Sequence, residues 1–160
     1  MKSKFNLLKK NVMIDLETLA STPDSAILSI GACKFDHTGI VDTFYRNIKM
    51  SSANRYDLRI DPATIDWWAD QLEMNGSSMD ALFKNSIGLA RALYEFNEWY
   101  GDSSLITWSK GSDFDLVIMR HAYKQVSTID NLDIEQPWNF KHGLCFRTMM
   151  ELFADFPGLK

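Results

Sequence analysis

With 160 residues, the chain has the size of one domain, which buries about two-thirds of its unfolded surface. A hydrophobic content of 46% and a charged content of 24% are those of an ordinary soluble globular protein. The net charge of −4 excludes binding of nucleic acid through overall positive charge, so such a partner would need metal ions and local Lys or Arg side chains. No stretch has the roughly 20 apolar residues of a membrane span, and Cys33 and Cys145 are too few for a disulfide framework. We therefore expect no membrane contact, reduced thiols and a cytoplasmic location.

Residues 12–18 (VMIDLET) form the first informative stretch. The apolar run 12–14 is typical of a buried strand. Side chains alternate across a strand, so Asp15 and Glu17 share one face while Leu16 points into the core on the other. Two strand steps place the carboxylates about 6.5–7 Å apart, within reach of a pair of metal ions ~3.5–4 Å apart. Mg²⁺ prefers such oxygen ligands; the alternative is that the strand ends here and both acids are solvated.

Two further strands are predicted at residues 26–35 and 40–48, joined by a turn at 36–39. Three consecutive strands with short connections indicate an antiparallel meander. Asp61 then caps a helix that has Pro62 at its first position. Apolar periodicity predicts a longer helix over roughly residues 79–100.

The second half of the sequence alternates short strands with helices. Residues 105–108 predict a strand parallel to the first, and 113–125 a helix. Residues 143–146 predict a final strand, after which Thr148 caps a last helix. The expected fold over residues 1–160 is a single α/β domain: a mixed sheet, with an antiparallel three-strand meander plus parallel strands, flanked by helices on both faces.

A second acidic stretch, residues 108–115 (WSKGSDFD), follows the predicted parallel strand. Asp113 and Asp115 lie about 200° apart around a helix, so at most one can face a shared site. Asp113 suits the N-terminal turn, where a carboxylate caps free amides. Asp115 then projects beside the end of the strand as a candidate ligand. The alternative is that both are helix-start acids.

Together these stretches resemble the DEDD (DnaQ-like) superfamily of 3′–5′ exonucleases, which have an RNase H-like fold. Residues 14–18 (IDLET) resemble its first motif, and Phe114-Asp115 with Ile118-Met119 resemble its second. The strand 29–32 (SIGA) and the helix 64–68 (TIDWW) are similar to a compact phage and bacterial branch of exoribonuclease-like members. The resemblance covers nearly the whole chain.

The resemblance implies hydrolysis of single-stranded RNA or DNA from its 3′ end to nucleoside 5′-monophosphates. Asp15, Glu17 and Asp115 would hold two Mg²⁺ or Mn²⁺ ions, one activating water and the other stabilising the leaving 3′-oxygen. Arg147 would contact phosphate, with a surface ion pair as the alternative.

The same resemblance places the terminal nucleotide against the backbone of Leu16, Thr18 and Leu19, with the Leu19 side chain as a wedge against the base. By its helical spacing Trp68 belongs to the core. Trp67 is then the candidate that stacks on a base, an interaction worth about 1–3 kcal/mol.

The sequence departs from the family at the third motif, a histidine or tyrosine followed by a last aspartate. Nothing after the final predicted strand matches it, and we expect the chain to be truncated before it. His121 and His142 lack an aspartate at the needed spacing, and His37 lies in a turn remote from the acids. Asp155 is a conceivable replacement ligand. The apolar surface that a missing helix uncovers is compatible with a homodimer. Two alternatives remain: a catalytically incomplete nucleic-acid-binding RNase H-like module, and a partner-binding domain whose acids are helix caps.

Overall fold

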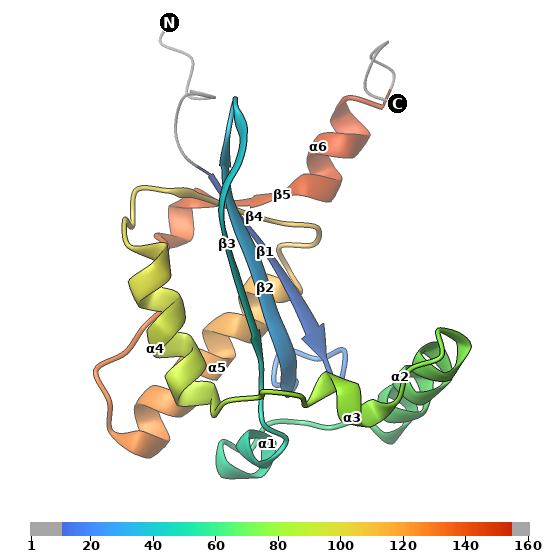
Figure 1. The fold of residues 1–160 in the computed structure, drawn as a ribbon. Coiled ribbons are helices and arrows are strands. Elements are labelled where there is room, and N and C mark those ends of the chain that lie inside the picture. Colours follow the sequence, from blue (N-terminus) through green and yellow to red (C-terminus); the bar gives the residue numbers. More distant parts are fainter. Residues whose placement is uncertain (1–10, 155–160) are drawn as a thin grey trace, which may run out of the picture.

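The computed structural model describes residues 11–154, and a five-stranded sheet with the strand order β3-β2-β1-β4-β5 runs through its centre (Figure 1). The strands are β1 (Asn11–Thr18), β2 (Ile27–Asp36), β3 (Gly39–Asn47), β4 (Ile106–Ser109) and β5 (Gly143–Cys145). The helices are α1 (Ser51–Arg55), α2 (Pro62–Met74), α3 (Met79–Leu82), α4 (Leu89–Tyr100), α5 (Asp115–Asp130) and α6 (Phe146–Leu152), with a 3₁₀ turn, η1 (Phe140–His142), before β5.

Strand pairing confirms the mixed sheet. β1, β2 and β3 form the antiparallel meander, β4 pairs parallel with β1, and β5 pairs parallel with β4. β4 runs beside the first part of β1 only, where residues 11–13 have partners in it. Beyond Met13, β1 has β2 on one side and, within the described residues, no strand on the other. This leaves room beside the acidic end of β1 for the segment that follows β4.

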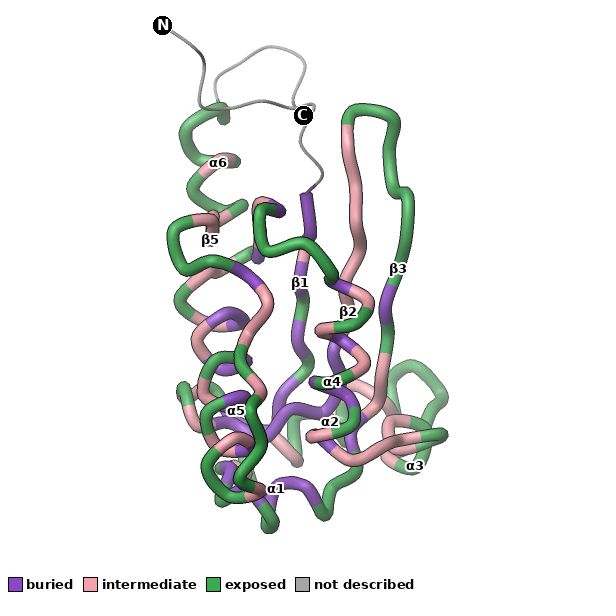
Figure 2. Tube along the Cα trace, turned by 90° about the vertical axis from the view of Figure 1, so that its left-hand side faces the viewer, coloured by how far each residue is buried: buried purple, intermediate pink, exposed green. Residues whose placement is uncertain are grey.

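One face of the sheet packs against α4 and α5 and forms the core (Figure 1). Ile14 is fully buried, and the ring of Phe44 meets that of Phe96 on α4 edge to face, with centroids 5.3 Å apart. Burying a side chain of this size stabilises the fold by roughly 1.5–3 kcal/mol. Figure 2 shows β1 alternating between purple and green, which is the buried and exposed alternation expected of a strand with one covered face.

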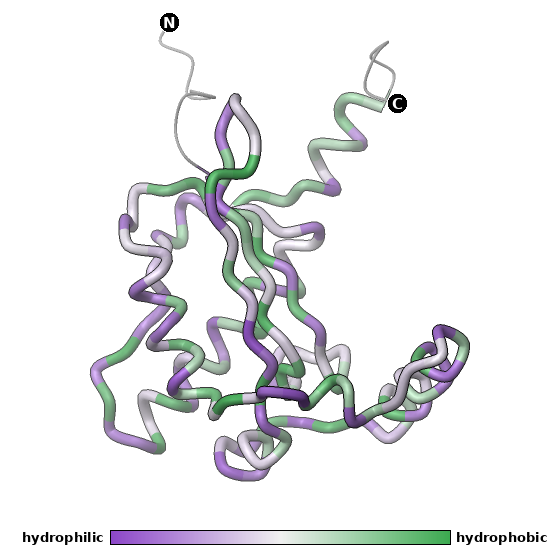
Figure 3. Tube along the Cα trace, viewed as in Figure 1, coloured by the Kyte–Doolittle hydropathy of each residue, from purple (hydrophilic) through white to green (hydrophobic). Residues whose placement is uncertain are grey.

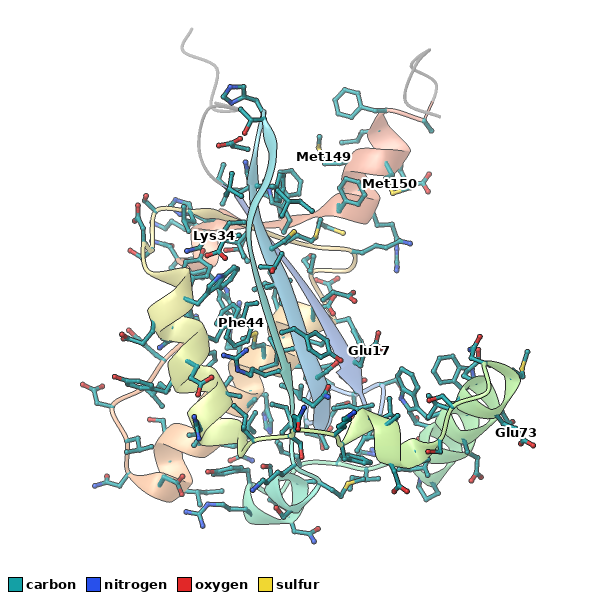
Figure 4. All side chains as sticks on the ribbon, in the orientation of Figure 1. Glu17, Lys34, Phe44, Glu73, Met149 and Met150 are labelled. Carbon is teal, nitrogen blue, oxygen red and sulfur yellow. The ribbon has the colours of Figure 1, made fainter. Side chains whose placement is uncertain are left out.

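The opposite face of the sheet is open, although helices were predicted on both faces. Asp15, Glu17 and Tyr45 are exposed there. In Figure 4, Glu17 lies on the side of the sheet away from α4, whereas Phe44 lies on the α4 side. Figure 1 shows α2 and α6 on this open side near the two ends of the sheet, so residues 11–154 leave the middle of the face uncovered.

The start of α2 is as predicted. The Asp61 carboxylate accepts a hydrogen bond of 3.0 Å from the Ala63 amide, and Pro62 occupies the first helical position. A side-chain cap of this kind is typically worth about 1 kcal/mol.

The single long helix predicted for residues 79–100 is wrong. α3 ends at Leu82 and α4 begins at Leu89. Between them, the Ile87 amide donates to the Asn47 carbonyl and the Ile87 carbonyl accepts from the Lys49 amide, both at 2.9 Å. Pairing with the end of β3 takes this backbone away from a helix. The apolar periodicity on either side gives no sign of the break.

The last helix, α6, begins at Phe146 rather than at the predicted cap, Thr148, and none of its residues is buried. Its apolar colouring in Figure 3 comes with exposed side chains, including Met150 at 51% exposure. The predicted stripe of Met149, Leu152 and Phe153 therefore packs against no core in the described part of the chain.

Within residues 11–154, no helix combines the length and the apolarity that crossing a membrane requires. Cys33 and Cys145 are both free, as expected.

Candidate functional site

The acidic end of β1 has the predicted geometry. Asp15 and Glu17 are exposed on the open face, while Leu16 between them is 5% exposed and contributes to the core. Side chains alternate between the two faces of a strand, and Val12 and Ile14, which precede Asp15, pack in the core. Both carboxylates therefore face solvent from a rigid central strand.

Asp115 reaches this pair from α5. Its side chain is buried, and its Oδ1 accepts a hydrogen bond of 3.0 Å from the backbone amide of Leu16. The bond spans 99 residues of sequence and fixes the start of α5 beside β1. It is possible because β4 ends before the acidic part of β1 and leaves the Leu16 amide without a strand partner on that side.

Asp113 does not cap α5 as predicted. The N-cap residue is Phe114, no side chain caps this helix end, and Asp113 is exposed in the turn before it. Asp115 lies in the first turn of α5, as in the alternative of a helix-start acid, but its carboxylate also accepts from a strand amide.

The three carboxylates interact electrostatically. Loss of hydration raises the pKa of Glu17 above its ordinary value, and the charges of Asp15 and Asp115 raise it further. Loss of hydration also raises the pKa of Asp115, the Leu16 amide lowers it, and the charge of Asp15 raises it. Arg147 opposes this by lowering the pKa of Asp115. Carboxylates that repel one another in this way favour a bound cation.

A cleft opens beside this cluster. It is lined by Asp15, Leu16, residues 110–115, Cys145 and Arg147. The Arg147 guanidinium lies next to Gly111, where Nη2 would be 3.8 Å from an added Cβ. The cleft thus places one arginine among the acids, and no histidine of the described residues lines it.

Cys145 is a lining residue to which the sequence pointed only indirectly. Hydrogen bonds from Thr148 and from the Ser112 backbone lower the pKa of its thiol to about 6. Residues that follow neighbouring parallel strands meet at one edge of a sheet. The ends of the predicted strands at 105–108 and 143–146 are the signal that could have placed Cys145 and the 110–114 loop together.

The structure does not support the expected contacts at Thr18 and Leu19. Leu19 is 2% exposed, so its side chain belongs to the core and has no surface for a base. The Leu19 amide donates to the Ala26 carbonyl, its carbonyl accepts from the Asp61 amide, and the Thr18 hydroxyl donates to the Ala20 carbonyl. The Leu16 amide is likewise held by Asp115. The wedge assigned to Leu19 is therefore wrong for this structure.

The two tryptophans of α2 separate as predicted. Trp68 is partly buried against the core, and its indole N–H donates a 3.0 Å hydrogen bond to the Thr18 carbonyl. Trp67 is 52% exposed and meets the Trp68 ring edge to face, with centroids 5.0 Å apart. The Trp67 ring is consequently available on the surface near the end of β1.

The histidines lie away from the cleft. His37 is exposed in the β2–β3 turn, His121 is on α5 and His142 is in η1. Asp155, the conceivable replacement ligand, lies outside the described residues.

A family model described as a 3′–5′ exoribonuclease Rv2179c-like domain matches residues 10–159. The chain belongs to this family. Rv2179c-like domains form a family of 3′–5′ exonucleases, which agrees with the resemblance of the sequence to the DEDD superfamily. Comparison with curated proteins finds no match.

Solved structures of exonuclease I share the fold of this Rv2179c-like domain. An exonuclease I complex with an SSB C-terminal segment gives a TM-score of 0.68 at 12% identity and covers 95% of this chain. The Escherichia coli enzyme with a dT13 oligonucleotide gives 0.66 at 11% identity over 93%. The enzyme from Methylocaldum szegediense gives 0.65 at 12% identity over 95%. The chain spans 32%, 30% and 31% of these proteins, respectively, so the likeness concerns about a third of each.

Proposed function

We propose that this chain is a 3′–5′ exonuclease that depends on Mg²⁺ or Mn²⁺ and releases nucleoside 5′-monophosphates from single-stranded nucleic acid. The hydrogen bond between Asp115 and the Leu16 amide carries the proposal, because it brings a third carboxylate to the two that β1 exposes. An acid with no role in a site is usually exposed, whereas Asp115 is 5% exposed.

The residues present suit a hard divalent cation. Within residues 11–154, no group of three or more His, Cys, Asp or Glu side chains could hold a metal ion in the arrangement that the structure shows. Mg²⁺ rarely needs three protein ligands, since it keeps several waters and is usually bound by one or two protein carboxylates together with substrate phosphate. Asp15, Glu17 and Asp115 would hold the ions. When bound, such ions activate water and stabilise the leaving oxygen of a phosphodiester.

The protein residues have separate tasks in this proposal. Asp115 is held rigidly by the Leu16 amide, so one ligand is fixed before any ion binds. Asp15 and Glu17 face solvent on the open side, where a terminal phosphodiester can approach. Arg147, next to Gly111 in the same cleft, supplies positive charge for a phosphate oxygen. Trp67 offers an exposed ring for a base.

Two of the comparisons support a proposal for the substrate class. The family description specifies an exoribonuclease, and one exonuclease I structure holds a dT13 oligonucleotide. We therefore propose a single-stranded 3′ end as the partner, with RNA as the preferred strand. DNA is the competing outcome, to be separated by assay.

The test uses the full chain with a 5′-labelled single-stranded RNA of about ten nucleotides and the matching DNA, in Mn²⁺ and in EDTA. The expected result is a slow ladder that shortens by one nucleotide at a time, with release of nucleoside 5′-monophosphates, in Mn²⁺ only, because the sequence does not match the third motif that would supply the general base. Asp15→Ala should abolish the ladder. Binding of the labelled strand without any cleavage in Mn²⁺ would refute the exonuclease and favour the catalytically incomplete binding module.

A further inference from the structure

We propose that the open face of the meander extends the substrate path beyond the acidic site. A single strand with its 3′ end at Asp15 and Glu17 crosses β2 at Gly31, stacks a base on Tyr45 and leaves along the edge of β3 past Lys84. This inference rests on the proposed exonuclease function and adds to it the surface that holds the upstream nucleotides.

The sheet register places these residues in one row. Asp15 is paired with Gly31 on β2, and Gly31 is paired with Tyr45 on β3. Directly opposed residues of antiparallel strands project from the same face. Neighbouring strands are about 4.8 Å apart, so the row from Asp15 to Tyr45 spans about 10 Å.

Gly31 has no side chain, so the middle of this row is shallow. A Cβ added at Gly31 would lie 3.5 Å from the Asp15 carbonyl oxygen and 3.8 Å from Cδ2 of Tyr45. The Tyr45 ring therefore leans over the glycine on the same face as the Asp15 side chain. A shallow depression, with a carboxylate on one side and an aromatic ring on the other, results from the missing side chain.

Tyr45 is the aromatic residue that this path needs. It is 59% exposed on a strand, a position in which a large ring usually packs against a neighbour. Its cross-strand neighbour is a glycine, so no side chain covers it from β2. An exposed ring beside a nucleic-acid site offers a sequence-tolerant stacking platform.

Positive charge lies next to Tyr45 at the sheet edge. A groove between β3, α3 and α4 is lined by Tyr45, Arg46, Asn47, Lys84, Arg91 and Glu95, among others. Arg46 and Arg91 each form an ion pair with Glu95 at 2.7 Å. Together with Lys84, the groove therefore has three cations and one anion in its lining. The side-chain amide of Asn47 donates a hydrogen bond to the Lys84 carbonyl, which ties the lysine-bearing segment to β3.

This charge is local, because the chain as a whole carries a net charge of −4. A groove with more positive than negative charge, continuous with an exposed ring, is complementary to a phosphate backbone with unpaired bases. Lys84 makes no ion pair within residues 11–154 and is the cation most available to phosphate.

The geometry predicts a length dependence. Stacked bases are separated by about 3.4 Å, so the 10 Å row corresponds to roughly three bases. A dinucleotide bound at Asp15 and Glu17 ends before Tyr45, whereas an octanucleotide passes Tyr45 and enters the groove. Tyr45 and Lys84 should therefore affect long substrates only.

The experiment measures binding of a labelled dinucleotide and a labelled octanucleotide to the full chain by fluorescence anisotropy in Mn²⁺, with phosphorothioate linkages to prevent cleavage. Tyr45→Ala should weaken octanucleotide binding about 5- to 100-fold and leave dinucleotide binding within about twofold. Tyr45→Phe, which keeps the ring, should bind both as the wild type does. Lys84→Ala should reduce the salt dependence of octanucleotide binding by about one phosphate contact, a slope change near 0.7.

Tyr94→Ala is the matched control, because Tyr94 is equally exposed, at 61%, but lies on α4 and does not line the groove. If Tyr45→Ala binds the octanucleotide as tightly as Tyr94→Ala does, the path is wrong while the exonuclease proposal stands. If the wild type binds neither oligonucleotide, both proposals fail together.

Discussion

Replacing Asp115 by Ala or by Asn should separate the two roles of this carboxylate. Both changes remove the buried charge, but only Asn keeps a side-chain oxygen that can accept from the Leu16 amide. In Asp115→Ala that amide is buried without a partner, which costs about 1–3 kcal/mol. The better helix propensity of Ala offsets about 0.5 kcal/mol of this. Asp115→Asn should therefore be the more stable variant by about 0.5–2.5 kcal/mol.

For a domain of this length, 1 kcal/mol corresponds to about 2–4 °C in melting temperature. Thermal melts followed by circular dichroism in EDTA at neutral pH should thus place Asp115→Asn roughly 1–10 °C above Asp115→Ala. Both variants should lose nuclease activity, since neither supplies an anionic ligand. An Ala variant that melts at or above the Asn variant would show that the contact between Asp115 and the Leu16 amide does not stabilise the fold.

Three further predictions concern the same region. Glu17→Gln should be more stable than the wild type in EDTA at about pH 8, because the fold raises the Glu17 pKa and so disfavours the charged side chain. This advantage should vanish in melts below pH 4.5, the ordinary pKa of the side chain. The same difference in melting temperature at every pH would contradict the raised pKa. Asp15→Ala should abolish Mn²⁺-dependent cleavage while its melting temperature stays within about 2 °C of the wild type, because this side chain is exposed; a large drop would instead indicate a structural role. Trp68→Ala should destabilise the protein by about 2–4 kcal/mol in urea titrations, because it loses core packing and the hydrogen bond to Thr18. Trp67→Ala should change stability by less than about 1 kcal/mol but weaken oligonucleotide binding. Equal effects of the two variants on stability would refute the assignment of Trp68 to the core and Trp67 to the surface.

Local signals in the sequence predicted the sheet and the residues that β1 exposes on its open face. The period of two in residues 12–18 correctly placed Asp15 and Glu17 on one face and Leu16 in the core, because strand geometry leaves no other arrangement. The Asp61-Pro62 start of α2 was equally local. The parallel pairing of β4 with β1 followed from the order of the elements.

Long-range backbone contacts explain the errors. The break between α3 and α4 depends on Ile87 pairing with the end of β3, which the periodicity of residues 79–100 does not contain. The burial of Leu19 depends on the chain after β1, which returns so that Ala26 and Asp61 form hydrogen bonds with the Leu19 backbone. By contrast, helix geometry alone favoured Asp115 over Asp113 as the residue that faces β1, although the bond between Asp115 and Leu16 joins motifs 99 residues apart and no local pattern contains it.

Direct measurement of Mn²⁺ binding tests most sharply whether Asp15, Glu17 and Asp115 form one cation site. The signal of free Mn²⁺ in electron paramagnetic resonance, titrated with the wild-type chain and with Asp15→Ala, Glu17→Gln, Asp115→Asn and Asp113→Asn, gives each affinity. We predict that the first three variants each weaken binding at least tenfold, while Asp113→Asn, an exposed acid lining the same cleft, binds within about twofold of the wild type. Unchanged affinity in the first three variants, or an equal loss in Asp113→Asn, would contradict a shared site.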